Sequence, residues 1–483
     1  MGTISSAFGL ISGALDADQS ALNVVANNVA NANTPGYTEE KPDWQENSPI
    51  TVNGITIGQG VTETGATSQR DRVLEQRLDQ QQQLASASNT RLAALNQMQA
   101  LFTPDSGSSS STAGDIGSDI TSFFDTFSSL ESDPNNNSLR ESVLSAASTL
   151  AGDISSTAAS LGSQRSAIDQ EATGIAGQVN SLSSSLAALN QQIESTSPDA
   201  DAGTLEDQRQ QDLSQLSQLI GINQVTTENN GLEITTTSGQ LLVSGSQSYQ
   251  LTTGTVNGVT DFFLGGSDIT SQLASGGGQL GGYLTARDQD IPAALNSLDQ
   301  LAYGISTQVN AANNSGTDLD GNEGNGTNSS GVVGNGATPL YIFKEPTQVA
   351  GSAAAMTVAM TDPNQIAAAS FGGGSGDNSN ATLIAGKANQ QIVNGQTPTD
   401  YYSNFVTTLG SAVSEVQTEN TAQNASVTQL QTQNNALSSV NLNDEAAAMS
   451  TLETSYQAAA QVFTMLNTII SSALNLGVET AVS

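Results

Sequence analysis

The chain has 483 residues, of which 12% are charged and 4% aromatic, and its 46 acidic side chains outnumber 11 basic ones to give a formal net charge of −35. This balance argues against nucleic acid and anionic lipid as partners, because both require clusters of Lys and Arg. The chain contains no Cys and no His, which excludes disulfides, thiol catalysis, a Ser-His-Asp triad and a histidine zinc site.

The N-terminus has no cationic segment followed by a continuous apolar core, so no cleavable signal peptide is expected. No stretch is long and apolar enough to span a bilayer, and we expect no membrane insertion. If the protein leaves the cell, we expect an export route that reads no cleaved signal.

The first predicted element is an amphipathic helix over residues 4–33. Its apolar side chains recur at alternating spacings of three and four, which makes a narrow apolar seam on a helix, and Asp18 is the one interruption. The seam consists of Ile4, Phe8, Ile11, Leu15, Leu22, Val25 and Val29. Pro35 and Gly36 end this helix, because Pro biases the preceding residue out of the helical region and Gly supplies turn geometry.

A connector at 38–68 combines Pro and Gly with short β-branched pieces, and we expect it to be irregular or to contain a hairpin. The chain then becomes largely helical, with many Ala, Ser and Gln residues. Helices are predicted at 69–102, around 120–130, at 139–195 and at 204–219.

From residue 222 onward, Thr, Val, Gly and Ile alternate, which predicts short strands separated by turns. The strands are expected within 232–243, 249–256 and 262–266. A helix at 286–312 and an Asn- and Gly-rich loop at 313–338 follow. A second mixed segment covers 340–395, and its clearest strand-like piece is MTVAM at 356–360.

Helices resume at about 399 and continue, with a boundary near 439–443, to the end of the chain. Asn441 and Asp444 fit a capping pattern for the last helix. This helix repeats the apolar seam without interruption. Its seam consists of Met449, Leu452, Tyr456, Ala459, Phe463, Leu466, Ile470 and Ala473. A single helix cannot bury such a seam against itself, so the two terminal helices are expected to pack on each other or on neighbouring subunits.

The predicted fold class is α+β, with an elongated multi-domain molecule in which matched helical arms flank a β-rich middle. The expected domains are a terminal coiled-coil domain of 1–37 plus 441–483, a connector of 38–68, a helical rod domain of 69–220 plus 399–440, and a β-rich middle domain of 221–398 that contains the helix 286–312. The competing interpretation is an α-helical bundle with an inserted β domain and no assembly role.

Several motifs resemble those of flagellar axial proteins. ANNVANANTPGY at 26–37 is similar to the N-terminal motif shared by flagellar rod, hook and hook-associated proteins, and the segment 438–462 resembles their C-terminal motif. Three interior segments, 120–147, 281–324 and 376–381, resemble the hook-associated protein 1 family, the FlgK type. The chain departs from this pattern at Glu39 and Glu40, at Ser439 and at Gln461, which puts specific polar contacts in question.

The resemblance implies a structural subunit at the junction between hook and filament, outside the cell, exported by the flagellar type III apparatus. It implies the hook protein and hook-associated protein 3 as neighbours, further copies of the chain in a ring, and a cytoplasmic export chaperone on the C-terminal helix. The alternatives are another axial protein, namely the hook protein or hook-associated protein 3, or a secreted adhesin or enzyme with axial-protein ends.

The expected assembly interface consists of the two seams and the motif that follows the first helix. The motif contributes Asn27, Asn28, Asn31, Asn33, Pro35, Gly36 and Tyr37. The four Asn residues are compatible with turn chemistry or with hydrogen bonds to neighbouring subunits, and the resemblance favours the second. We expect the terminal helices 4–33 and 443–474 to be poorly ordered in the free monomer, because isolated amphipathic helices are marginal in water.

No catalytic, cofactor or metal site is predicted, and the chain is expected not to be an enzyme. Asp318 begins a segment that resembles a calcium loop, but Glu323 stands where the sixth-position Gly is needed and Ser329 where the twelfth-position acid is needed. The Gly-rich segment 372–378 is not followed by the Lys of a phosphate-binding loop.

Overall fold

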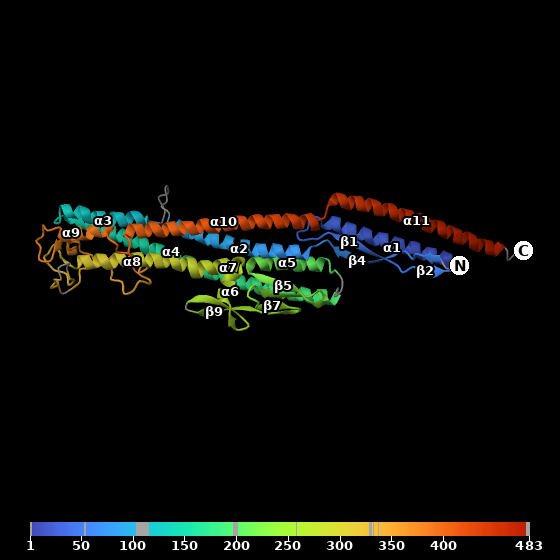
Figure 1. The fold of residues 1–483 in the computed structure, drawn as a ribbon, viewed down its shortest axis with the longest axis horizontal. Coiled ribbons are helices and arrows are strands. Elements are labelled where there is room, and N and C mark those ends of the chain that lie inside the picture. Colours follow the sequence, from blue (N-terminus) through green and yellow to red (C-terminus); the bar gives the residue numbers. More distant parts are fainter. Residues whose placement is uncertain are drawn as a thin grey trace.

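The computed structural model describes residues 2–52, 55–102, 115–196, 201–256, 258–327, 331, 333–336 and 338–479. The molecule is a long rod with both chain ends at the same tip (Figure 1). An arm of two helices forms that tip, a bundle of helices forms the rod, and a group of small sheets projects from its side.

The arm consists of α1 (Gly2–Asn31) and α11 (Leu442–Glu479), which lie side by side. The rod contains the long helices α2 (Arg72–Ala100), α4 (Asn137–Thr196) and α10 (Pro398–Ser438). The shorter helices are α3 (Ile116–Ser132), α5 (Thr204–Leu219), α6 (Thr270–Gly276), α7 (Gly278–Thr285), α8 (Ile291–Asn313) and α9 (Ser379–Ala385). The 60 residues of α4 span about 90 Å at 1.5 Å per residue, so this helix runs along most of the rod.

Local sequence explains where the rod helices begin. The Asp71 side chain accepts hydrogen bonds from the backbone N–H groups of Val73 and Leu74, which caps α2. Thr397 and Asp400 cap α10 reciprocally, because the Asp400 N–H donates to the Thr397 hydroxyl and that hydroxyl donates to the Asp400 carboxylate. The two helices that begin at these caps lie side by side along the rod (Figure 1).

All sheets are small and antiparallel. In the connector, β1 (Glu40–Glu46) pairs with β4 (Val61–Ser68), and β2 (Ile50–Val52) pairs with β3 (Ile55–Ile57), so the hairpin interpretation of this segment is confirmed. A four-stranded sheet has the order β5 (Ile222–Thr226), β6 (Leu232–Thr236), β7 (Leu241–Ser244), β8 (Gln247–Ser248). A three-stranded sheet contains β9 (Leu251–Val256), β10 (Val259–Leu264) and β11 (Ser267–Asp268), and the two-residue strands β12 (Gly316–Thr317) and β13 (Ala369–Ser370) form a further pair.

Two hydrophobic cores hold the rod together. The larger lies at the end far from the arm, where Phe123 packs against Phe124, Phe127 and Phe343 with ring centroids 5.1–5.5 Å apart. The smaller joins the second half of α4 and α5 to the small sheets and α7. Most of the buried apolar residues of 286–393 belong to the larger core, so packing divides the predicted β-rich segment between two cores.

Two expectations for the middle of the chain need correction. The segment 356–360 is not a strand, because Met356 and Met360 turn into the larger core and only Val358 forms an isolated bridge, to Phe343. The predicted helix 286–312 begins earlier than its apolar pattern indicated. One π-helical turn, Ala286–Asp290, joins α7 to α8, and the buried Arg287 within it is held by Asp169 and Asp288.

Candidate functional site: the paired arm and its joint to the rod

The two predicted seams face each other along the arm. The rings of Phe8 and Phe463 have centroids 4.4 Å apart. Three further α1 seam residues, Ile11, Leu15 and Leu22, are half-buried, while Val25 is buried and Val29 is exposed. The α1 and α11 seams therefore cover each other only partly.

The α11 seam has the same character. Phe463 is half-buried, and so are five other residues of this seam, namely Met449, Leu452, Ala459, Leu466 and Ile470. Tyr456 is exposed, and the side chains of Ile4 and Ala473 lie outside the described residues.

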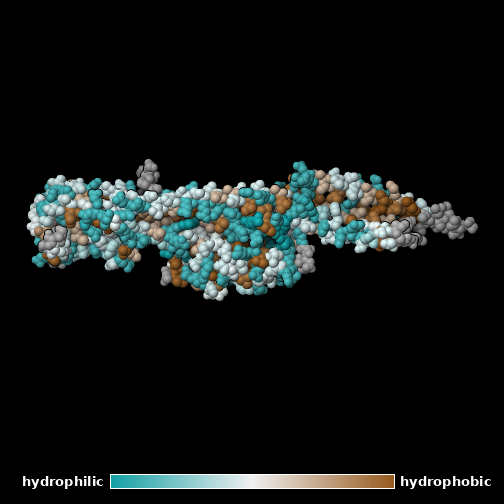
Figure 2. Space-filling model, in the orientation of Figure 1, coloured by the Kyte–Doolittle hydropathy of each residue, from teal (hydrophilic) through white to brown (hydrophobic). Residues whose placement is uncertain are grey.

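A second apolar stripe lies on α11 and was not among the predicted interface residues. Val462, Met465 and Ile469 lie beside the seam and are exposed, Met465 to 60% of its surface. The signal was present in the sequence, since α11 has apolar residues directly adjacent to seam positions, which widens the apolar face beyond a single line. Figure 2 shows hydrophobic residues gathered on the arm toward its tip.

Asn28 connects the arm to the connector within the chain. Its Oδ1 accepts hydrogen bonds from the Tyr37 hydroxyl at 2.8 Å and from the Glu40 N–H at 3.0 Å. Its Nδ2 donates to the Glu40 carbonyl oxygen at 2.8 Å and to Glu445 Oε1 at 3.0 Å. These four bonds use the full capacity of the amide, so in this structure Asn28 is hydrogen-bonded entirely within the chain.

The remaining motif residues form the turn that leaves α1. The Asn31 side chain accepts from the Thr34 hydroxyl and donates to Asn27, while Asn33 is exposed. Pro35, Gly36 and Tyr37 follow, with Gly36 at a φ of +79°, a conformation that favours glycine. Turn chemistry therefore accounts for Asn31. Asn27 is exposed, and its amide accepts from Asn31 and donates to the Tyr37 hydroxyl, while Asn33 is exposed.

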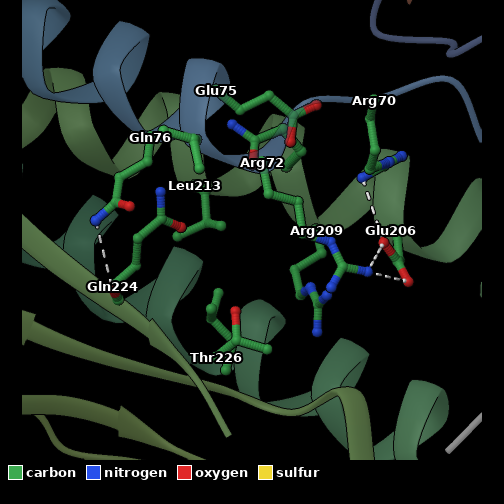
Figure 3. Close-up of a pocket in the computed structure, with 12 residues that line it drawn as sticks. Arg70, Arg72, Glu75, Gln76, Glu206, Arg209, Leu213, Gln224 and Thr226 are labelled. Carbon is green, nitrogen blue, oxygen red and sulfur yellow. Dashed lines mark hydrogen bonds and ion pairs between the residues drawn. The ribbon is translucent and has the colours of Figure 1, made fainter. Parts of the chain in front are cut away.

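A network of charged residues fastens the connector to the rod (Figure 3). Arg70, at the start of the rod, forms ion pairs with Glu206 at 3.5 Å and with Asp207. Arg72 contacts Glu206 at 2.9 Å. Burial acts to raise the pKa of Glu206, but a hydrogen bond from Asn230 and the two guanidinium groups lower it below its ordinary value. Glu206 is therefore held ionised in a buried position.

The same network extends to the connector backbone. The Thr38 N–H donates to Asp207 Oδ2 at 3.1 Å, and the Ser68 N–H and hydroxyl donate to Asp201 at 2.6 and 2.9 Å. Both ends of the connector are thus attached to the start of α5. The sequence does not predict this joint, because its partners are more than 130 residues apart and the acidic first turn of α5 is the one local sign of it.

The acidic residues of the described part of the chain do not gather into a metal site. No group of three or more Asp or Glu side chains that could hold a metal ion occurs among the described residues. The Asp318 carboxylate instead accepts from the backbone and side chain of Asn322, as in a turn. Among the described residues no helix has the length and apolar character needed to cross a membrane.

Comparison with protein families identifies two regions. Residues 95–327 match the model described as the flagellar hook-associated protein FlgK helical domain, and residues 11–38 match the flagella basal body rod protein model. The first region covers parts of both rod cores, and the second covers most of α1 and the turn that follows.

Curated relatives align over nearly the whole chain. The flagellar hook-associated protein 1 of Salmonella typhimurium is 26% identical over an alignment that covers 96% of this chain and 98% of the relative. The proteins of the same name from Escherichia coli and Bacillus subtilis are 25% and 26% identical, with 96% of this chain covered in each case.

A solved structure shares the fold. The flagellar hook junction protein FlgK from Burkholderia pseudomallei superposes with a TM-score of 0.62 at 19% sequence identity, covering 74% of this chain and 99% of that one. This superposition shows the fold, while the family match and the full-length relatives show that the chain is similar to FlgK-type flagellar hook-associated proteins along nearly its whole length.

Proposed function

We propose that the chain is a structural subunit of the bacterial flagellum at the hook–filament junction, and that it assembles through its terminal helices. The observation that carries this proposal is the incomplete covering of the arm. Two helices pair along their seams, yet α11 keeps Val462, Met465 and Ile469 exposed on a surface that no other described part of the chain covers.

Burial of these side chains supplies a driving force for assembly. A fully buried side chain of this size contributes roughly 1.5–3 kcal/mol, whereas ordering the backbone costs roughly 1–2 kcal/mol per residue. For a single arm, the cost of ordering every residue therefore exceeds the gain from the seam side chains alone. When neighbouring arms cover each other's exposed stripe, the additional burial makes ordering favourable. Monomers therefore stay apart before assembly, and the arms become ordered at the growing end.

The proposed partners follow from the family. They are the hook protein on one side, hook-associated protein 3 on the other, and further copies of the chain in a ring. A cytoplasmic export chaperone on the C-terminal helix and the flagellar type III apparatus complete the proposed set, with export that uses no cleaved signal and a final location outside the cell. We also propose that the subunit has no catalytic role, since its family is structural.

The proposed assembly surface comprises residues 1–37 and 441–483 with the seam and motif positions named above, except that Asn28 acts within the chain. The exposed stripe on α11 is added to it. Asn27 and Asn33 remain proposed contacts to a neighbouring subunit, because their amides are exposed.

The test is complementation of a flagellated strain that lacks its own FlgK-type protein. Flagella are isolated, and the amount of this chain on them is measured by immunoblot. Met465→Asp places a charge on the exposed stripe, and we expect it to reduce incorporation at least tenfold. The matched control is Thr464→Asp, an exposed position beside it on the same helix, which should assemble normally. Equal incorporation of the two variants would contradict the proposal.

A further inference from the structure

An acidic cavity of about 570 Å³ lies where the turn that leaves α1 meets α2, α5 and the end of α10. Three carboxylates line it, those of Glu75, Asp79 and Asp207, and the described lining includes no Lys or Arg, although Asp207 is ion-paired with Arg70 behind it. The rim includes the exposed residues Gln431 and Asn435, so the cavity opens to the surface.

Several buried polar atoms of the residues that line the cavity have no hydrogen-bond partner. Asp79 is only 2% exposed, and its Oδ2 accepts from Gln210 and Gln224 while its Oδ1 has no partner. Asn434 Oδ1 and the Ser438 hydroxyl also line the cavity, are buried, and have no partner. A buried polar atom without a partner is unfavourable, so the lining favours an occupant that donates hydrogen bonds. A positively charged occupant would in addition favour the ionised form of Asp79.

The chain itself presents such a group on the opposite side of α2. Arg77 is exposed, and its side chain makes no hydrogen bond or ion pair within the described chain. It lies two residues from both Glu75 and Asp79, and two residues correspond to about 200° around a helix at 3.6 residues per turn. The unpaired cation and the acidic cavity therefore lie at the same height on the rod and face away from each other.

The surroundings of Arg77 have the character of a contact surface. Val73, Arg77, Gln80 and Leu84 follow one another at spacings of four, three and four, which places them on one face of α2. Val73 is 59% exposed and Leu84 is 48% exposed. An Arg flanked by apolar side chains is typical of the residues that dominate binding at protein interfaces.

We propose that, in the assembled ring, the Arg77 side chain of one copy enters the acidic cavity of the adjacent copy, while Val73 and Leu84 cover its rim. This rests on the proposed function, since it requires copies side by side. The contact is heterologous, which means that one surface of a copy meets a different surface of the next, the arrangement that generates rings. A guanidinium group fits the cavity because its five N–H donors can reach several acceptors at once.

The absence of cysteine makes cross-linking a direct test. The variant Gln80→Cys with Asn435→Cys keeps Arg77 and carries one thiol on the α2 face and one at the cavity rim, so disulfides that join these two positions link different copies. The matched control combines Gln80→Cys with Ser403→Cys, an exposed position about 48 Å further along α10. Both variants are expressed in the strain that lacks its own FlgK-type protein, and isolated flagella are oxidised.

We expect a ladder of dimers and larger multimers from the first variant and none from the control. A missing ladder, with the first variant present on the flagella by immunoblot, overturns the proposal. If the unsubstituted chain is itself absent from the flagella, the proposed function fails as well, so the two failures are distinguishable.

A charge reversal provides the second test. Arg77→Glu opposes an acidic side chain to the acidic cavity, and we expect incorporation into flagella to fall at least fivefold, with Arg77→Lys close to normal. Lys344→Glu is the matched control, since Lys344 is also an exposed cation with no side-chain ion pair in the described chain, far from the joint. Equal thermal unfolding of the purified monomers shows that folding is unaffected. Equal incorporation of Arg77→Glu and Lys344→Glu would overturn the proposal.

Discussion

Asn28 and Glu445 lie 417 positions apart in the sequence, yet the Asn28 Nδ2 donates a hydrogen bond to Glu445 Oε1 at 3.0 Å. Asn28 stands near the end of α1 and Glu445 in the first turn of α11, so this bond fixes the two arm helices at their base. Burial raises the pKa of Glu445, and the bond from Asn28 acts in the opposite direction. The arm is therefore anchored by polar groups at its base and by the apolar seams above it.

Replacement of Asn28 should loosen this anchor. Asn28→Ala leaves the Glu40 N–H and carbonyl, the Tyr37 hydroxyl and the Glu445 carboxylate without their partner. Because a buried polar group without a partner costs roughly 1–3 kcal/mol, we expect hydrogen exchange of the amides in 38–46 to accelerate by at least tenfold in isolated flagella, where the arm is assembled. The matched control is Asn27→Ala, at an exposed neighbouring position. Similar exchange rates in the two variants would show that Asn28 does not anchor the arm.

Asp79 should make stability depend on pH. Burial raises its pKa to about 7 from an ordinary value of 3.8, although hydrogen bonds from Gln210 and Gln224 act to lower it and Glu75 acts to raise it. Between pH 4 and 7 the unfolded chain ionises Asp79 while the folded chain keeps the proton, so the free energy of unfolding falls as pH rises and levels off above pH 7.

The measurement is urea unfolding of wild type and Asp79→Asn at pH 4 and pH 8, followed by circular dichroism. The Asn variant lacks this titration, so its stability relative to wild type should increase by about 4 kcal/mol between the two pH values, since one pKa unit corresponds to roughly 1.4 kcal/mol. Asp125→Asn, at an exposed position on α3, controls for the loss of one charge. A constant difference for Asp79→Asn at both pH values would contradict the prediction.

Trp44 should become protected on assembly. It is the single tryptophan of the chain, lies on β1 and is 46% exposed, with Ile50, Ile57 and Val61 also exposed on the connector. A cluster of exposed apolar residues is typical of a contact surface. Hydroxyl-radical footprinting with mass spectrometry should therefore show at least fivefold less oxidation of Trp44 in isolated flagella than in the monomer. Tyr249, exposed beside the small sheets, serves as the internal reference, and equal protection of both residues would refute a specific contact at the connector.

Amide hydrogen exchange on the purified monomer tests the expectation that the terminal helices are poorly ordered before assembly. Residues 4–33 and 443–474 should exchange almost freely, because each helix buries only one seam against one partner. The core helices of the rod, with Phe123 and Leu150 fully buried, should be strongly protected. Protection of both termini in the monomer would show that the paired seams suffice for order and that assembly does not drive their folding.

Much of the helical architecture could be predicted from local pattern. The expected helix 204–219 coincides with α5, and the expected helix 139–195 differs from α4 by two residues at the start and one at the end. The boundary near 439–443 falls between α10 and α11, where Asn441 accepts from the Asn443 N–H and donates to Asp444. Helices of this length succeed because periodic apolar residues and capping groups act within a few positions of each other.

The joint could not be predicted in this way. Arg70 and Glu206 are 136 positions apart, and nothing in the local sequence distinguishes a paired Arg from a solvated one. The strand expected at 356–360 failed for a related reason. Its alternating pattern is that of a strand. Met356 and Met360 are instead buried in the larger core, and this packing outweighs the local preference for a strand.

The sequence by itself determined the helices, the two terminal seams and the resemblance to flagellar axial proteins, since each depends on residues that are close together or on a recognisable motif. Only the tertiary structure decided that Asn28 closes the base of the arm, that Arg70 and Glu206 fasten the connector, and that Arg77 and Asp79 lie on opposite sides of one helix beside different surroundings. The physical reason is that burial and charge pairing depend on which distant segments meet, and the free energy of the whole packed chain decides that.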